Sequence, residues 1–221
     1  MNILVILALV FAALEALALS KNWNRLEWLA KPAVMVCLFA WLYLSTGLQG
    51  VTLWFGVGLV FSLAGDVLLM ISLDRMFIFG LVAFLFAHVA YLFGFQNELM
   101  EFGPWSVLLI VILSVSAVRV MRRIVSAMRA KGQTRMINPV ILYSTVITVM
   151  LYAAMTTISN PEWKTNASFF VSVGAFLFYL SDIILAWNKF VSPIQNGRIL
   201  NIAAYHLGQI GLIAGVIAQF G

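Results

Sequence analysis

Charged residues are scarce in this sequence. They make up 10% of its 221 residues, and hydrophobic residues make up 63%, whereas a soluble domain is about 25% charged and about 45–50% apolar. The composition therefore excludes a soluble globular protein. Because a membrane-spanning helix needs about 20 apolar residues, the spans fill the chain, and we expect residues 1–221 to form a single transmembrane domain.

Cysteine is nearly absent. The lone Cys37 excludes an intramolecular disulfide. A secretory signal peptide is not indicated either, because no basic residue precedes the apolar residues 3–19, whereas Lys21 and Arg25 follow them. We expect this segment to be retained as the first span.

Proline is also rare, and short polar or Gly/Pro breaks separate long apolar runs. The pattern predicts an all-α protein, a polytopic membrane helical bundle of eight transmembrane helices. The expected spans are 3–19, 31–46, 51–71, 76–96, 105–120, 139–159, 168–188 and 199–219. Only the connection 119–138 is expected to be long.

Basic residues are distributed unevenly between the predicted loops. The odd-numbered loops carry 3, 1, 6 and 2 Lys and Arg residues, and the even-numbered loops carry 0, 0 and 1. The positive-inside rule then places the odd loops in the cytoplasm and both termini on the non-cytoplasmic side. The net charge of +5 therefore marks orientation in the membrane, and no nucleic-acid partner is expected.

The fifth loop contains four arginines at near-helical spacing, Arg119, Arg122, Arg123 and Arg129. This pattern has two interpretations. It is typical of an interfacial basic helix that binds anionic lipid. The simpler interpretation, which we favour, is a topology anchor at the end of the fifth helix.

Most acidic residues fall in predicted loops, namely Glu27, Asp74, Glu98, Glu101 and Glu162. Glu15, Asp66 and Asp182 instead lie within predicted spans, and so do both histidines, His88 and His206. Because an ionisable group inside a bilayer is costly, such residues usually face a bundle interior or a wet cavity.

The predicted depths of these residues favour one half of the bilayer. Asp66 and Asp182 each lie about six residues before the cytoplasmic end of a span, which is roughly 9 Å. Tyr205, His206 and Gln209 lie in the same half, and Lys31 precedes Pro32 at the expected start of the second span. A polar chamber open to the cytoplasm is the simplest arrangement, with the His88 and Tyr91 pair nearer the midplane.

A faint internal repeat accompanies these residues. Residues 62–69 resemble residues 179–185, each segment contains an aspartate, and each precedes a helix that bears a histidine. Pro32 and Pro139 open corresponding helices. This pattern predicts two four-helix halves, a 4+4 parallel repeat related by an axis along the membrane normal.

Several motifs resemble those of the lysoplasmalogenases, the YhhN-like integral membrane hydrolases. The matching stretches are Lys31-Pro32, residues 61–70, residues 80–91, Ser181-Asp182, residues 185–190, and Tyr205 with Gln209. The pair Ser-x-x-Gly-Asp and Gly-x-x-x-Phe-x-x-x-His-x-x-Tyr is fairly specific. His206 departs from the pattern, because the family usually has a tyrosine there.

The resemblance implies hydrolysis of the vinyl ether bond of lysoplasmalogens, which releases a fatty aldehyde and glycerophosphoethanolamine or glycerophosphocholine. This chemistry needs a proton donor, an anion beside the resulting cation, and a positioned water. Our hypothesis is that Asp66 and Asp182 form a carboxylate pair in which one is protonated and one ionised. His88 would orient water or relay protons, without a metal or other cofactor.

The resemblance also implies a lysophospholipid substrate from the surrounding membrane lipids. Lys31 and Lys189 would meet its phosphate at the cytoplasmic rim. The residues expected to contact substrate are Glu15, Lys31, Tyr91, Tyr143, Asn188, Lys189, Tyr205, His206 and Gln209. We expect an integral protein of a bacterial inner (plasma) membrane with its site open to the cytoplasmic leaflet.

Two other functions use the same residues. An ion- or proton-coupled transporter also needs intramembrane Asp and His, although the spans contain few of the mid-helix breaks typical of transporters. A zinc hydrolase would use His88, His206, Asp66 and Asp182 as ligands, but the sequence has no short His or Cys ligand spacing.

Overall fold

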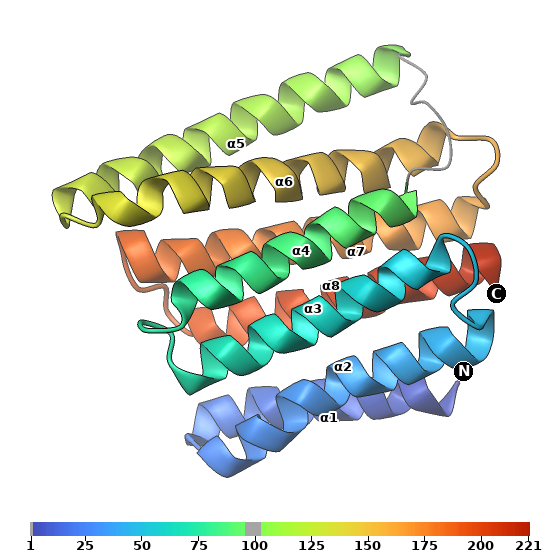
Figure 1. Ribbon diagram of the computed structural model, residues 1–221, viewed down its shortest axis with the longest axis horizontal. Helices are drawn as coiled ribbons and strands as arrows, with labels where there is room; N and C mark the ends of the chain where they lie inside the picture. Colours follow the sequence, from blue (N-terminus) through green and yellow to red (C-terminus); the bar gives the residue numbers. More distant parts are fainter. Residues whose placement is uncertain (1, 96–102) are drawn as a thin grey trace.

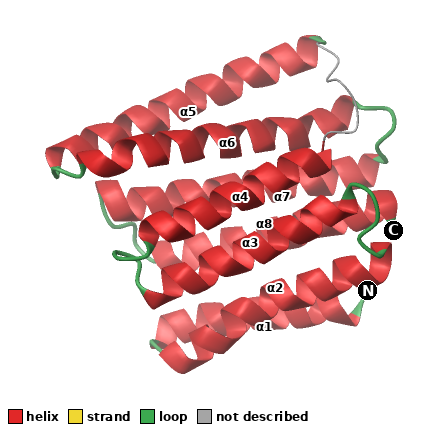
Figure 2. Cartoon of the chain, in the orientation of Figure 1, coloured by secondary structure: helices red, strands yellow, loops and turns green. Residues whose placement is uncertain are grey.

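The computed structural model describes residues 2–95 and 103–221, and all regular structure in these ranges is helical (Figure 2). The long helices are α1 (Ile3–Lys21), α2 (Asn24–Thr46), α3 (Thr52–Ile71), α4 (Phe77–Phe95), α5 (Pro104–Ala130), α6 (Ile137–Thr156), α7 (Thr165–Ala186) and α8 (Gly197–Phe220). Within the described ranges, eight helices are long and apolar enough to cross a membrane. The predicted all-α bundle of eight spans is confirmed, and the protein is an integral membrane protein.

Short elements complete the connections. The 3-10 turns η1 (Thr134–Met136) and η2 (Thr157–Ser159) flank α6, and the π-helical turn η3 (Trp187–Val191) extends α7. Helix ends follow local sequence. The Asn2 side chain accepts a hydrogen bond from the Leu4 amide at the start of α1, and Asn22 and Gly47 adopt the left-handed conformation that ends α1 and α2.

The helices run roughly side by side along the long axis of the molecule (Figure 1). α8 contacts α1, α2, α3 and α7, and α6 contacts α4, α5 and α7. α5 therefore lies at one edge of the bundle and the α1–α2 hairpin at the other, as Figure 1 shows. Both termini lie at the same end, as an even number of spans requires. Which side of the membrane that end faces stays a prediction, as does the 4+4 repeat.

The start of the second span was predicted incorrectly. α2 begins at Asn24 and not near residue 31, so Pro32 lies inside the helix and does not open it. Residues 24–31 contain good helix formers and no Gly or Pro, so the helix begins before Lys31. Glu27 in this first part of α2 pairs with Arg198 of α8 at 2.8 Å. Lys31 is consequently one-third of the way along the helix and buried, and not at the rim.

The predicted long connection 119–138 is also wrong. α5 continues as a helix through the four arginines to Ala130, and only a short turn precedes α6. The segment contains Arg, Met, Ala, Val and Ile, with no Gly or Pro before Gly132, so nothing in it terminates the helix. The basic segment is thus the end of the fifth helix itself. Glu98 and Glu101, predicted in a loop, lie outside the described residues.

Glycines allow close approach between the helices that carry the polar residues. A Cβ atom added at Gly174 of α7 would lie 2.4 Å from the Leu212 amide nitrogen, and one at Gly208 of α8 would lie 2.7 Å from that of Phe178. The two helix backbones therefore touch, as in small-residue packing of membrane helices. In the same way, Gly58 of α3 leaves room for the ring of Tyr91.

Candidate functional site

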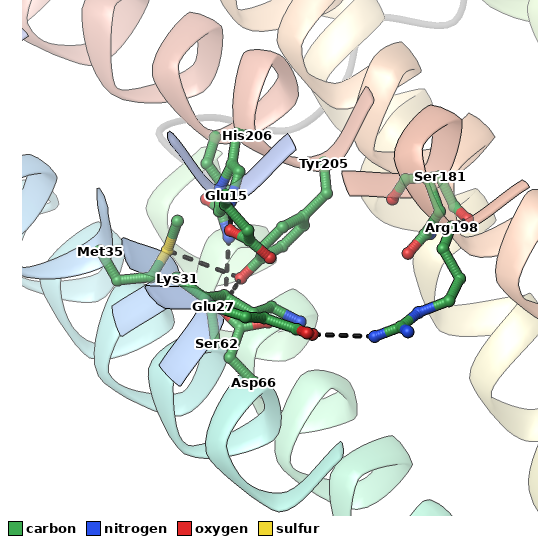
Figure 3. A network of polar contacts seen from close by, with 12 residues as sticks. Glu15, Glu27, Lys31, Met35, Ser62, Asp66, Ser181, Arg198, Tyr205 and His206 are labelled. Carbon is green, nitrogen blue, oxygen red and sulfur yellow. Dashed lines mark hydrogen bonds and ion pairs between the residues drawn. The ribbon is translucent and has the colours of Figure 1, made fainter. Parts of the chain in front are cut away.

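A buried ion pair joins α2 and α3. Lys31 Nζ lies 3.1 Å from Asp66 Oδ1, and the two side chains are 10% and 1% exposed. Tyr205 of α8 donates a hydrogen bond to Asp66 Oδ2 at 2.7 Å. Figure 3 shows these side chains pointing toward one another from three helices. Both oxygens of Asp66 are thus occupied by donors, as a buried carboxylate requires.

One further pair and one chain of three hydrogen-bonded residues lie beside it. His206 Nε2 contacts Glu15 Oε2 at 2.5 Å, which joins α8 to α1, and both side chains are fully or almost fully buried (Figure 3). Gln209, one helical turn after Tyr205, accepts from the Tyr91 hydroxyl at 2.7 Å and donates to Ser62 Oγ at 2.9 Å. We call these residues and the ion pair the Lys31 network: Glu15, Lys31, Ser62, Asp66, Tyr91, Tyr205, His206 and Gln209.

A second group of polar side chains joins α4, α6 and α7. The hydroxyl of Tyr143 donates a hydrogen bond to Asp182 Oδ2 and lies 2.9 Å from His88 Nε2. His88 Nε2 is also 3.5 Å from the same Asp182 oxygen. His88 is fully buried, whereas the Asp182 side chain is 15% exposed. We call His88, Tyr143 and Asp182 the Asp182 triad.

Aromatic rings separate the Asp182 triad from the Lys31 network. The Phe178 ring centroid lies 4.6 Å from that of His88 and 5.2 Å from that of Tyr205, and the Phe84 ring packs edge-on against Phe178 and Tyr205. Within the described residues no hydrogen bond or ion pair joins Asp66 to Asp182. The structure therefore does not bring the two aspartates together. His88 and Tyr91 also diverge, each into a different network.

An apolar pocket adjoins the Asp182 triad. Its polar lining residues are Tyr143, Ser144, Tyr179 and Asp182, and the rest of the lining comes from apolar side chains of α3–α7 and from Phe190 of η3. Asp66 does not line it. The pocket has the composition expected for holding an alkyl chain against a few polar groups.

Two predicted substrate contacts lie apart from both networks. Lys189 of η3 is 3.0 Å from Asp74 Oδ1, donates to the Leu73 carbonyl, and stacks over the Phe77 ring. The Asn188 side chain accepts from the Ile194 amide at 2.7 Å and contacts the start of α8. Both residues hold the α7–α8 connection in place.

Some site residues were not identified from the sequence. Ser62 stands one helical turn before Asp66, within the Ser-x-x-Gly-Asp motif, so the spacing of four already placed it on the same face. Phe84 belongs to the Gly-x-x-x-Phe-x-x-x-His-x-x-Tyr motif but was not assigned to the site. Phe178 was counted among many apolar residues, and nothing in the sequence distinguishes it from a packing residue.

No metal site is found in the described part of the chain. Across residues 2–95 and 103–221, no three His, Cys, Asp or Glu side chains are close enough to hold a metal ion together. The four ligands that a zinc hydrolase would use are divided between the two networks, and His206 pairs with Glu15.

Eight apolar helices that enclose paired carboxylates, histidines and a lysine define an integral membrane protein with a polar site inside its helical bundle. The sequence pattern of the YhhN family matches residues 26–216, so the chain belongs to that family. The resemblance inferred from the motifs is thereby confirmed.

Curated relatives are similar over most of the chain. Lysoplasmalogenase TMEM86B of Homo sapiens is 26% identical over 190 residues, which cover 85% of this chain and 75% of that protein. Lysoplasmalogenase TMEM86B of Mus musculus is 28% identical over 192 residues, 86% of this chain and 74% of that protein. A lysoplasmalogenase homolog of Dictyostelium discoideum is 27% identical over 188 residues, 76% and 61% of the two chains. No solved structure matches.

Proposed function

We propose that this protein is a membrane hydrolase that cleaves the vinyl ether bond of lysoplasmalogens, with the Asp182 triad as its acid–base centre. Relatives named lysoplasmalogenase support the activity. The observation that carries the assignment of the centre is the partial exposure of Asp182 on the wall of an apolar pocket.

Asp182 is the better proton donor of the two aspartates. It borders the pocket in which an alkenyl chain can lie, and among the described residues its carboxyl pairs with His88 but with no lysine or arginine. Asp66 is enclosed, and Lys31 stabilises its ionised form. Asp66 is therefore a positioning residue, because it fixes Tyr205, whose ring packs on Phe178 beside His88.

The triad can move a proton without moving heavy atoms. In one arrangement a protonated His88 donates to Tyr143, which donates to ionised Asp182. In the other, protonated Asp182 donates to Tyr143, which donates to neutral His88 Nε2. Both arrangements contain the same number of protons, since a tyrosine hydroxyl donates once and accepts as well. A chain of this kind returns a proton to Asp182 after each turnover.

The reaction follows from these positions. Asp182 gives its proton to the β-carbon of the vinyl ether, and the electron pair of the double bond forms the new C–H bond. The resulting oxocarbenium ion lies beside the new carboxylate, which stabilises it. Water adds to the cation and loses a proton to the triad, and the hemiacetal then separates into the fatty aldehyde and glycerophosphoethanolamine or glycerophosphocholine. General acid–base help of this kind contributes about 10²–10⁴-fold.

Aldehyde release from lysoplasmenyl-ethanolamine by the purified protein tests the proposal. Asp182→Asn should lower kcat about 10²-fold or more, and Tyr143→Phe should lower it less, because His88 can still reach Asp182 directly. Tyr43→Phe is the matched control, since Tyr43 is 54% exposed and far from the triad in sequence. Full activity in Asp182→Asn would exclude the triad, and a folded, inert wild type would exclude the hydrolase.

The orientation is part of the same proposal. The basic ends of the helices face the cytoplasmic side of a bacterial inner membrane, and the pocket receives its lipid from the cytoplasmic leaflet. The distribution of basic residues supports this orientation.

A further inference from the structure

Two arginines near the end of α5 line a groove of their own. Arg122 and Arg129, with Ser126 between them, form its polar side, and Val118, Met121, Val125 and Ile141 form its apolar side. The two arginines are seven residues apart, so they stand on one face of the helix about 10 Å apart along its axis. The groove therefore combines two cations with an apolar strip.

The groove adjoins the pocket that reaches Asp182. Met121 lines both of them, and on α6 the groove residue Ile141 is next to Val140 of the pocket. Because they share Met121, the groove and the pocket meet where α5 packs on α6. Figure 1 shows α5 at the edge of the bundle beside α6. A molecule with an apolar chain in the pocket can place its polar end in the groove.

The lysines first expected to bind phosphate are already engaged. Lys31 pairs with Asp66 in the bundle interior, and Lys189 pairs with Asp74. Arg122 and Arg129 are exposed, and among the residues that the structure describes no carboxylate lies within ion-pair distance of either. Guanidinium groups bind phosphate with two parallel hydrogen bonds each.

We propose that the Arg122–Arg129 groove binds the phosphate of the lysophospholipid whose chain occupies the pocket beside Asp182. The identity of this ligand as substrate rests on the proposed function, but its binding does not depend on hydrolysis. The groove then sets which end of the lipid faces α5 and places the ether near the triad.

Binding of an uncleavable lipid tests the site. The probe is a lysophosphatidylethanolamine with a saturated alkyl ether, and the comparison ligand is the same alkyl glycerol ether without phosphate. Both are measured by calorimetry with protein in a maltoside detergent, which contributes no phosphate. Arg122→Gln/Arg129→Gln should weaken binding of the phosphate lipid about tenfold or more and leave binding of the phosphate-free ether unchanged.

Arg119→Gln/Arg123→Gln is the matched control. It removes the same charge from exposed positions of the same helix, but neither residue lines the groove. If both double variants weaken binding of the phosphate lipid equally, the effect comes from surface charge alone, and the proposed phosphate site is wrong. Unchanged binding in the groove variant would also overturn it.

The two proposals fail in different ways. If wild-type protein binds the phosphate lipid through the groove but releases no aldehyde from the vinyl ether substrate, the phosphate site stands and the hydrolase fails. If wild-type protein releases aldehyde and the groove variant has an unchanged KM, the hydrolase stands and the phosphate site fails.

Discussion

Lys31 and Asp66 are each buried well inside the bundle, and each is tolerable there only with the other. A buried charge that loses its partner typically destabilises a protein by about 3–5 kcal/mol. Lys31→Met should therefore destabilise the fold by about that amount, and Lys31→Met/Asp66→Leu should recover much of the loss. The free energy of unfolding, measured by SDS titration of protein in mixed micelles, checks both.

The Arg198–Glu27 pair provides the comparison. Its arginine side chain is 72% exposed, and exposed pairs contribute about 0–1 kcal/mol. Arg198→Gln should therefore change unfolding little. If Arg198→Gln lowers the free energy of unfolding as much as Lys31→Met does, burial is not the reason for the importance of Lys31.

Sequence reasoning identified most of these residues but not their partners. An ionisable residue inside an apolar run is visible in any membrane sequence, which is why Glu15, Asp66, His88, Asp182 and His206 were found. Which of them meet depends on the rotation of each helix about its axis. The Glu15–His206 contact joins residues 191 positions apart, and no local pattern specifies it.

At the scale of elements, the α7–α8 hairpin positions both networks at once. α7 carries Asp182 and Phe178, and α8 carries Tyr205 and His206, so any separation of the helices disturbs the two networks together. Gly174→Ala should destabilise the protein by about 1–3 kcal/mol, because the new methyl group meets the α8 backbone, which cannot turn aside. Thermal unfolding in detergent measures this destabilisation. The same change should also lower aldehyde release.

Gly103→Ala is the control, since a Cβ atom there meets no atom of the described residues within 4 Å. Equal unfolding temperatures for the two variants would show that the α7–α8 backbones are not in contact.

The helix boundaries show why elements were predicted better than their ends. Apolar runs gave the number of helices, because length and hydrophobicity decide which segments cross a bilayer. The ends of α2 and α5 were missed because charged residues there were interpreted as loop. Long basic side chains continue a helix readily and extend toward the membrane surface, so charge marks the end of a span and not the end of the helix.

For the whole molecule, the remaining prediction is its direction in the membrane. Twelve of the thirteen basic residues are assigned to the odd-numbered connections and their flanking helix ends, and the structure places both termini at the opposite end of the bundle (Figure 1). If the end that carries the basic connections faces the cytoplasm, an impermeant maleimide applied to intact cells should not label Gln133→Cys or Gln195→Cys in a Cys37→Ser background. It should label Gln49→Cys and Glu162→Cys, all four positions being exposed.

Disrupted cells, in which all four cysteines should react, provide the control for accessibility. The reverse pattern in intact cells would place the basic ends outside. The proposed phosphate groove would then face the opposite leaflet, and its lipid would have to come from there. The labelling experiment therefore tests from which leaflet the pocket beside Asp182 takes its lipid, because the groove and the pocket share Met121 and adjoin on α5 and α6.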